Sequence, residues 1–165
     1  MTAVDYSPQA VAYCQKRHSI SNLAFEVGDA EALPFADGSF DAVVNVESSH
    51  CYGSMATFVS EVTRVLRPGG FFLFADLREV AEMPKLQALI AAQKGLEIVE
   101  QEDITAMVLA ALRGDEQRKR AMIDDLVPAN QRALFDEFAG LEGSKIMNGL
   151  ESRSIVYHRF VVKRV

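Results

Sequence analysis

Residues 28–46 read GDAEALPFADGSFDAVVNV, and this stretch decides the fold class. Pro34 and the Asp37–Gly38 pair are turn signals, so the first half is predicted to form a loop. The apolar run over residues 40–46 predicts a buried strand. A short apolar strand bounded by a turn-rich loop is typical of an α/β sheet.

On both sides of this stretch, apolar runs alternate with helical patterns, which indicates βαβ units on a parallel sheet. Ser7 and Pro8 are favourable first residues of a helix. The predicted strands are residues 2–4 ending at Asp5, 23–27, 40–46, 71–75 ending at Asp76, 96–99 and 154–162. The predicted helices are residues 8–18, 54–66 (stopped by Arg67-Pro68-Gly69-Gly70), 84–94, and a mostly helical segment from 104 to 140 broken at Pro128. We therefore expect one α/β domain over residues 1–165, with 104–140 as a helical cap.

Composition narrows the function classes. The net charge of −6 argues against nucleic acid as a partner, because phosphate binding needs clustered Lys and Arg. The basic run of residues 118–120 has acidic neighbours on both sides and is interpreted as a solvated helix face. No apolar run reaches the ~18 residues of a membrane span, and the first residues do not resemble a signal peptide. Cys14 and Cys51 fit no metal or disulfide spacing. We expect a cytoplasmic protein without a metal.

Polar residues follow four of the predicted strands, where ligands bind in open α/β sheets. A carboxylate at a strand end suits the two hydroxyls of a ribose, and a glycine allows a ligand to approach the backbone. This pattern indicates an adenosine site, which NAD, ATP and S-adenosylmethionine would all fit. The candidate residues are Asp5, Tyr6, Gly28, Asp29, Ala30, Asn45, Val46 and Glu47, followed by His50 and Asp76.

Two motifs carry a resemblance to a known family. The stretch from residue 28 to Val43 resembles the middle motifs of class I S-adenosylmethionine-dependent methyltransferases, and EVTRVLRPGG at 61–70 resembles their late motif. Residues 45–52 and 74–78 are similar to a narrower group, the phthiotriolone/phenolphthiotriolone dimycocerosates methyltransferases of mycobacteria, which methylate a lipid hydroxyl. The pattern around residues 104–109 is similar as well.

The resemblance implies a Rossmann-like sheet and S-adenosylmethionine as cofactor. Asp5 would bind the ribose hydroxyls, Asp29 the adenine amine, and residues 45–47 would line the methionine end. The family's first strand and glycine-rich loop would precede Asp5, where this chain has only residues 1–4. The resemblance therefore predicts an incomplete sheet, and a chain that alone is inactive or marginally stable.

His50 is the candidate general base, because a neutral imidazole can remove a hydroxyl proton near pH 7. Asp76 is predicted to orient it. The alternative is a loop histidine with no proton to transfer. For the whole chain we expect O-methylation of a hydroxyl on a small natural product or lipid. A non-catalytic fragment remains open. The Pro-Gly-Gly motif and the Gly-Asp-Ala-Glu loop argue against a nucleotide-binding dehydrogenase, which would also need its own glycine fingerprint.

Overall fold

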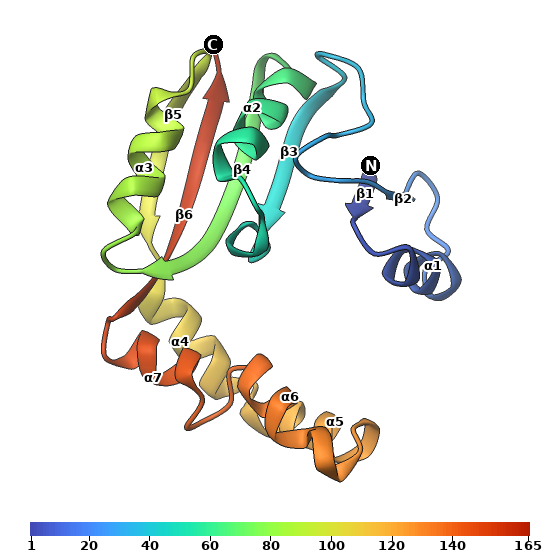
Figure 1. The fold of residues 1–165 in the computed structure, drawn as a ribbon, viewed down its shortest axis with the longest axis vertical. Helices are drawn as coiled ribbons and strands as arrows, with labels where there is room; N and C mark the ends of the chain where they lie inside the picture. Colours follow the sequence, from blue (N-terminus) through green and yellow to red (C-terminus); the bar gives the residue numbers. More distant parts are fainter.

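The computed structural model describes residues 1–165, and its largest element is a four-stranded sheet (Figure 1). The strand order is β3-β4-β6-β5, with β3 parallel to β4 and β6 antiparallel to both β4 and β5. The bounds are β3 Phe40–Val46, β4 Leu66–Glu79, β5 Leu96–Asp103 and β6 Ile155–Arg164. The sequence indicates βαβ units on a parallel sheet, and β3 and β4 do pair in parallel, whereas the last strand inserts between β4 and β5 in the opposite direction.

Strand β4 is much longer than the predicted strand over residues 71–75. Its first part contains the Pro68-Gly69-Gly70 turn, where the register against β3 jumps from Leu66 to Phe71. Gly69 has a φ of 82°, and a Cβ on Gly70 would lie 2.9 Å from the carbonyl oxygen of Asp41. At its other end, β4 continues to Glu79 because β6 pairs with it beyond the end of β3. The prediction that Asp76 ends this strand is wrong for the same reason.

One face of this sheet is covered by helices α2 (Met55–Val65) and α3 (Met83–Ala92) (Figure 1). Ser54 caps α2, since its side chain accepts from the N–H of Thr57. Phe72 and Phe74 of β4 point into this core, which also includes Phe58, Val59, Val62, Leu86, Ile90, Phe160 and Val162. The intervening residues Phe71 and Leu73 remain 39% and 40% exposed. The alternation of the strand thus separates a packed face from an open one.

A smaller unit contains β1 (Thr2–Asp5), α1 (Pro8–Arg17) and β2 (Ala24–Val27). The two strands are parallel and form a sheet of their own, which shares no strand pairing with β3 (Figure 1). The predicted Ser7 cap is confirmed, because its hydroxyl accepts from the N–H of Ala10. The loop after β2 leads to β3 and is hydrogen-bonded to side chains of α2.

Glu61 and Arg64 of α2 hold that connecting loop. The Glu61 carboxylate accepts from the N–H of Leu33 at 2.8 Å, and Arg64 donates to the carbonyl oxygens of Leu33 and Phe35 at 2.9 and 2.6 Å. The two side chains also pair with each other at 2.7 Å. These contacts explain why a Glu-x-x-Arg pair accompanies the loop motif in the sequence.

Short helices follow β5 and lie beyond the C-terminal end of β3 (Figure 1). They are α4 Thr105–Gly114, α5 Glu116–Leu126, the 3-10 turn η2 Ala129–Gln131, α6 Arg132–Phe138 and α7 Lys145–Glu151. The predicted helical content and the break at Pro128 are confirmed, whereas α7 was not predicted. No helix of the structure has the length and apolar character needed to cross a membrane. The assignment of residues 104–140 as a cap within a single domain stays a prediction.

Candidate functional site

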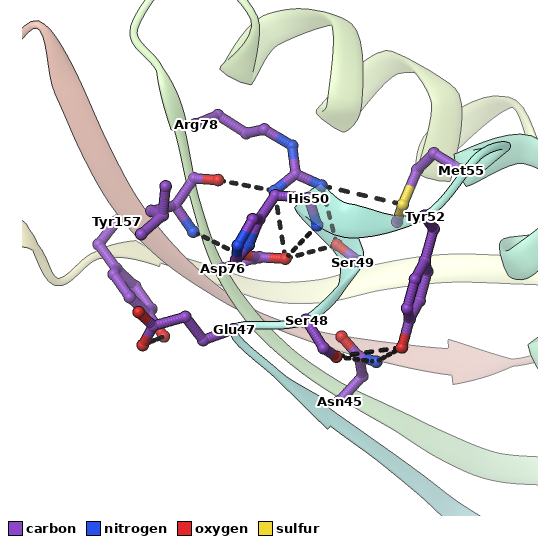
Figure 2. A network of polar contacts seen from close by, with 11 residues as sticks. Asn45, Glu47, Ser48, Ser49, His50, Tyr52, Met55, Asp76, Arg78 and Tyr157 are labelled. Carbon is purple, nitrogen blue, oxygen red and sulfur yellow. Dashed lines mark hydrogen bonds and ion pairs between the residues drawn. The ribbon is translucent and has the colours of Figure 1, made fainter. Parts of the chain in front are cut away.

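His50 and Asp76 lie in direct contact at the end of β3 (Figure 2). His50 belongs to the short 3-10 turn η1 (Ser49–Cys51), and Asp76 lies within β4. The His50 Nδ1 atom is 2.9 Å from Asp76 Oδ1. The histidine side chain is 35% exposed, whereas that of Asp76 is fully buried. The structure thus joins a solvent-accessible imidazole to a buried carboxyl group, as the sequence predicted.

The carboxyl group of Asp76 is held by five donors. Two come from the imidazole and the N–H of His50, and the hydroxyl of Ser49 donates at 2.5 Å. The N–H of Leu77 donates at 2.8 Å, and Arg78 forms an ion pair at 3.1 Å. Burial alone would raise the pKa of Asp76, but the hydrogen bonds from Ser49 and His50 and the charge of Arg78 hold it below its usual value. Asp76 is therefore ionised at neutral pH.

An ionised Asp76 determines which nitrogen of His50 carries the proton. A carboxylate only accepts, so Nδ1 must donate to it. In the neutral imidazole, Nε2 then has a free lone pair. The pair can remove a proton from a neighbouring group and stabilise the resulting imidazolium.

The side chain of Asn45, near the end of β3, forms hydrogen bonds with the loop that contains His50. Its amide nitrogen donates to the Ser48 hydroxyl at 2.9 Å and to the Tyr52 hydroxyl at 2.8 Å. Its side-chain oxygen is buried and has no partner within the chain. The expected place of Asn45 at the methionine end of a cofactor stays a prediction, and this orphaned oxygen is the atom that could accept from a ligand.

Glu47 has a backbone φ of 51°, a left-handed conformation that is uncommon for a residue other than glycine. Its N–H still donates to the carbonyl of Ala75 at 2.9 Å. The Tyr157 hydroxyl on β6 donates to its carboxylate at 3.2 Å (Figure 2). Tyr157 is only 4% exposed. Burial and the charge of Glu47 raise the pKa of Tyr157, so its phenol remains protonated.

Sequence reasoning missed Tyr157, although it lies in the alternating apolar pattern of the last strand. That pattern predicts a strand, but it does not show which residue of β3 the tyrosine will meet. The two partners are 110 residues apart in the chain. His158 beside it is half-buried, and burial lowers its pKa.

A cavity of about 540 Å³ opens between the strand ends and the helices that follow β5. Glu47 and Tyr157 line it, together with Val46 and Ala75 from the sheet. Its other walls are mainly apolar and include Ile104, Val108, Ala111, Leu112 and Ala139. Apolar residues of α4 and of its N-terminal flank thus border a ligand-sized space.

The remaining candidates belong to the β1–β2 unit. Asp5 and Asp29 follow neighbouring parallel strands, so they share one edge. One oxygen of each accepts from a nearby backbone N–H, of Ser7 and Glu31 respectively, at 2.8 Å. The second oxygen of each carboxylate has no partner within the chain, which suits binding of hydroxyl or amine donors. The residues present fit the adenosine part of a cofactor.

Three further candidates lie close by. Tyr6 is 78% exposed. A Cβ on Gly28 would come within 2.8 Å of a Val4 methyl group. Packing against β1 is therefore enough by itself to explain a glycine at this position. The part of Gly28 and Ala30 in ligand binding stays a prediction.

Comparison with known proteins shows what the chain as a whole is similar to. Residues 1–74 match the family model of a methyltransferase domain. The chain is 41% identical over 159 residues to the phthiotriol/phenolphthiotriol dimycocerosates methyltransferase of Mycobacterium tuberculosis, which covers 96% of this chain and 58% of that relative. A fatty-acid O-methyltransferase of Mycolicibacterium smegmatis is 38% identical over 83% of this chain and 50% of its own length. The chain thus spans a little over half of these relatives.

Solved structures show the same fold. A geranyl diphosphate C-methyltransferase from Streptomyces coelicolor, in complex with S-adenosyl-L-homocysteine, matches with a TM-score of 0.71 at 16% identity, over 99% of this chain and 61% of that one. A Haemonchus contortus phosphoethanolamine-type N-methyltransferase with S-adenosylhomocysteine matches with a TM-score of 0.71 at 17% identity, over 99% and 43%. The predicted Rossmann-like fold, with only part of the sheet, is confirmed. In sequence and in fold, this chain is similar to class I S-adenosylmethionine-dependent methyltransferases.

Proposed function

We propose that the protein transfers a methyl group from S-adenosylmethionine to a hydroxyl of a lipid or small natural product. The observation that carries this proposal is the His50–Asp76 pair, in which a buried carboxylate orients an accessible imidazole. Such a pair is suited to removing a proton from an alcohol. Relatives named for phthiotriol and fatty-acid methylation support a lipid acceptor.

In this mechanism each residue has a defined task. The bound cofactor supplies a methyl group on a sulfonium. His50 Nε2 accepts the hydroxyl proton as the oxygen attacks, and Asp76 stabilises the imidazolium through the 2.9 Å contact. General-base catalysis of this kind contributes roughly 10² to 10⁴ in rate. The largely apolar cavity, whose lining includes Glu47 and Ala75, would position the acceptor.

The need for a base favours a hydroxyl over a carboxyl acceptor. A fatty acid is already ionised at neutral pH, so its oxygen can attack without losing a proton. An alcohol must lose its proton during the reaction. A buried, five-donor carboxylate behind the imidazole would have no role in methylating a carboxylate.

Asp5 and Asp29 are proposed to bind the adenosine part of the cofactor, through the carboxylate oxygens that have no partner in the chain. Gly28, Ala30 and Tyr6 would line this part, and Asn45 and Val46 the methionine end. The alternative, a polypeptide of this family that does not catalyse, predicts cofactor binding without methyl transfer, or neither.

Calorimetry and a methyl-transfer assay test the proposal together. Titration of the protein with S-adenosylmethionine and S-adenosylhomocysteine should show binding of both, whereas NAD should not bind. Transfer of labelled methyl to a long-chain alcohol should follow. Tight NAD binding would contradict the cofactor assignment, and binding without transfer to any hydroxyl acceptor would favour the non-catalytic alternative.

A further inference from the structure

We propose that Glu47 and Tyr157 form an acceptor gate, which admits neutral alcohols to the apolar cavity and repels carboxylates. This inference rests on the proposed function and identifies the residues that decide which polar group the site accepts. Glu47 is thereby assigned to the acceptor rather than to the cofactor.

The position of Glu47 is built into the fold. Its φ of 51° turns the chain at the end of β3, and its N–H remains bonded to Ala75 of β4. Left-handed backbone at a non-glycine residue is costly and persists where the surrounding structure imposes it. The turn brings the carboxylate across β4 to the hydroxyl of Tyr157 on β6, 3.2 Å away (Figure 2).

The pair offers one charge and one committed donor. Burial and the neighbouring carboxylate raise the pKa of Tyr157, so the phenol remains protonated and donates to Glu47. The negative charge at this end of the cavity is therefore not cancelled by a cation, since Tyr157 is neutral.

Two other charged groups line the cavity, and only one of them is paired with an opposite charge. Asp115 pairs with Arg118 at 2.5 Å. The ammonium of Lys119 donates to the carbonyl oxygen of Ala139 at 2.7 Å. The rest of the lining is largely hydrocarbon from the strand ends and α4. An apolar chain fits these walls, and Glu47 decides which polar group can accompany it.

Electrostatics then separates two acceptors of equal chain length. A neutral alcohol meets no charge repulsion from Glu47, whereas an ionised acid would place a second carboxylate beside it. Like charges placed close together disfavour binding. We expect 1-decanol to bind about 10-fold or more tightly than decanoate at neutral pH, where the acid is ionised.

The experiment measures binding of 1-decanol and decanoate to the full chain by calorimetry, separately from methyl transfer. Glu47→Gln keeps the shape and removes the charge, so decanoate should bind at least about fivefold more tightly and the preference should shrink. Asp115→Asn is the matched control, because it removes a carboxylate of the same cavity that is already paired with Arg118. Its preference for decanol should match that of the unmodified protein.

Several results would overturn the gate. Equal or tighter binding of decanoate to the unmodified protein is one, and absence of binding by both probes is another. An Asp115→Asn effect as large as that of Glu47→Gln would assign the discrimination to the cavity as a whole. A Glu47→Gln protein that loses S-adenosylmethionine binding but keeps its alcohol preference would indicate that Glu47 binds the cofactor and not the acceptor. Normal binding preference without methyl transfer would instead count against the proposed function.

Discussion

The two halves of the molecule hold their carboxylates in opposite ways. In the four-stranded sheet, Asp76 is fully buried and receives five donors from its own chain. In the β1–β2 unit, Asp5 is exposed and accepts only from the N–H of Ser7, two residues away. The first arrangement fixes a reactive pair in advance, whereas the second leaves lone pairs for a ligand. We therefore propose that acid–base chemistry belongs to the larger sheet and that the smaller unit binds the adenosine part of the cofactor.

Removing the imidazole should have the largest effect. His50→Ala should lower the rate of methyl transfer to an alcohol by roughly 10² to 10⁴, because the hydroxyl proton then has no base. Single-turnover measurements with saturating S-adenosylmethionine would give this rate directly. His18→Ala is the matched control, since His18 only follows the last turn of α1.

Asp76→Asn should impair the same step while leaving the imidazole in place, because an amide no longer enforces the Nδ1–H tautomer. A His50→Ala protein with normal turnover would show that His50 is only a loop residue. Comparable losses in His50→Ala and His18→Ala would point to a general disturbance of the fold.

The packed and open faces of β4 provide the next test. Phe72 is fully buried under α2 and α3, whereas its neighbour Leu73 is 40% exposed on the other face. Phe72→Ala should lower the free energy of unfolding by about 3–5 kcal/mol, and Leu73→Ala by about 1 kcal/mol or less. Urea denaturation of both variants would measure this. Equal losses would mean that the open face is covered in solution.

Acid should weaken the junction between β5 and α4. Burial would raise the pKa of Asp103, but hydrogen bonds from Thr105 and the ion pair with Arg153 lower it to about 2. A carboxyl group whose pKa is depressed by folding stabilises the protein above its unfolded value, about 3.9, and that stabilisation is lost as pH falls through 2. We expect a loss of about 1–2 kcal/mol over this range.

Urea denaturation at about pH 5 and about pH 3 would measure that loss. Asp103→Asn should be less stable at the higher pH and should lose less on acidification. A variant with the same acid dependence as the unmodified protein would assign the effect to other carboxyl groups.

Local sequence signals predicted the local parts of this structure well. The strand over residues 40–46 and the Ser7 cap agree with the structure, since turn residues and apolar periodicity act over a few positions. The His50–Asp76 contact followed from two polar residues near neighbouring strand ends. The extension of β4 to Glu79 could not be predicted, because it depends on antiparallel pairing with a strand that begins at Ile155. The Glu47–Tyr157 contact escaped prediction for the same reason.

One set of calorimetric titrations with S-adenosylmethionine tests most directly whether the β1–β2 unit binds the cofactor while His50 of the larger sheet acts on the acceptor. His50→Ala should bind the cofactor as tightly as the unmodified protein, because the imidazole is assigned to the acceptor. Asp5→Ala should bind it about 10-fold or more weakly, since a charge-assisted hydrogen bond to the ribose is lost. The reverse result, with weak binding to His50→Ala and normal binding to Asp5→Ala, would contradict the account.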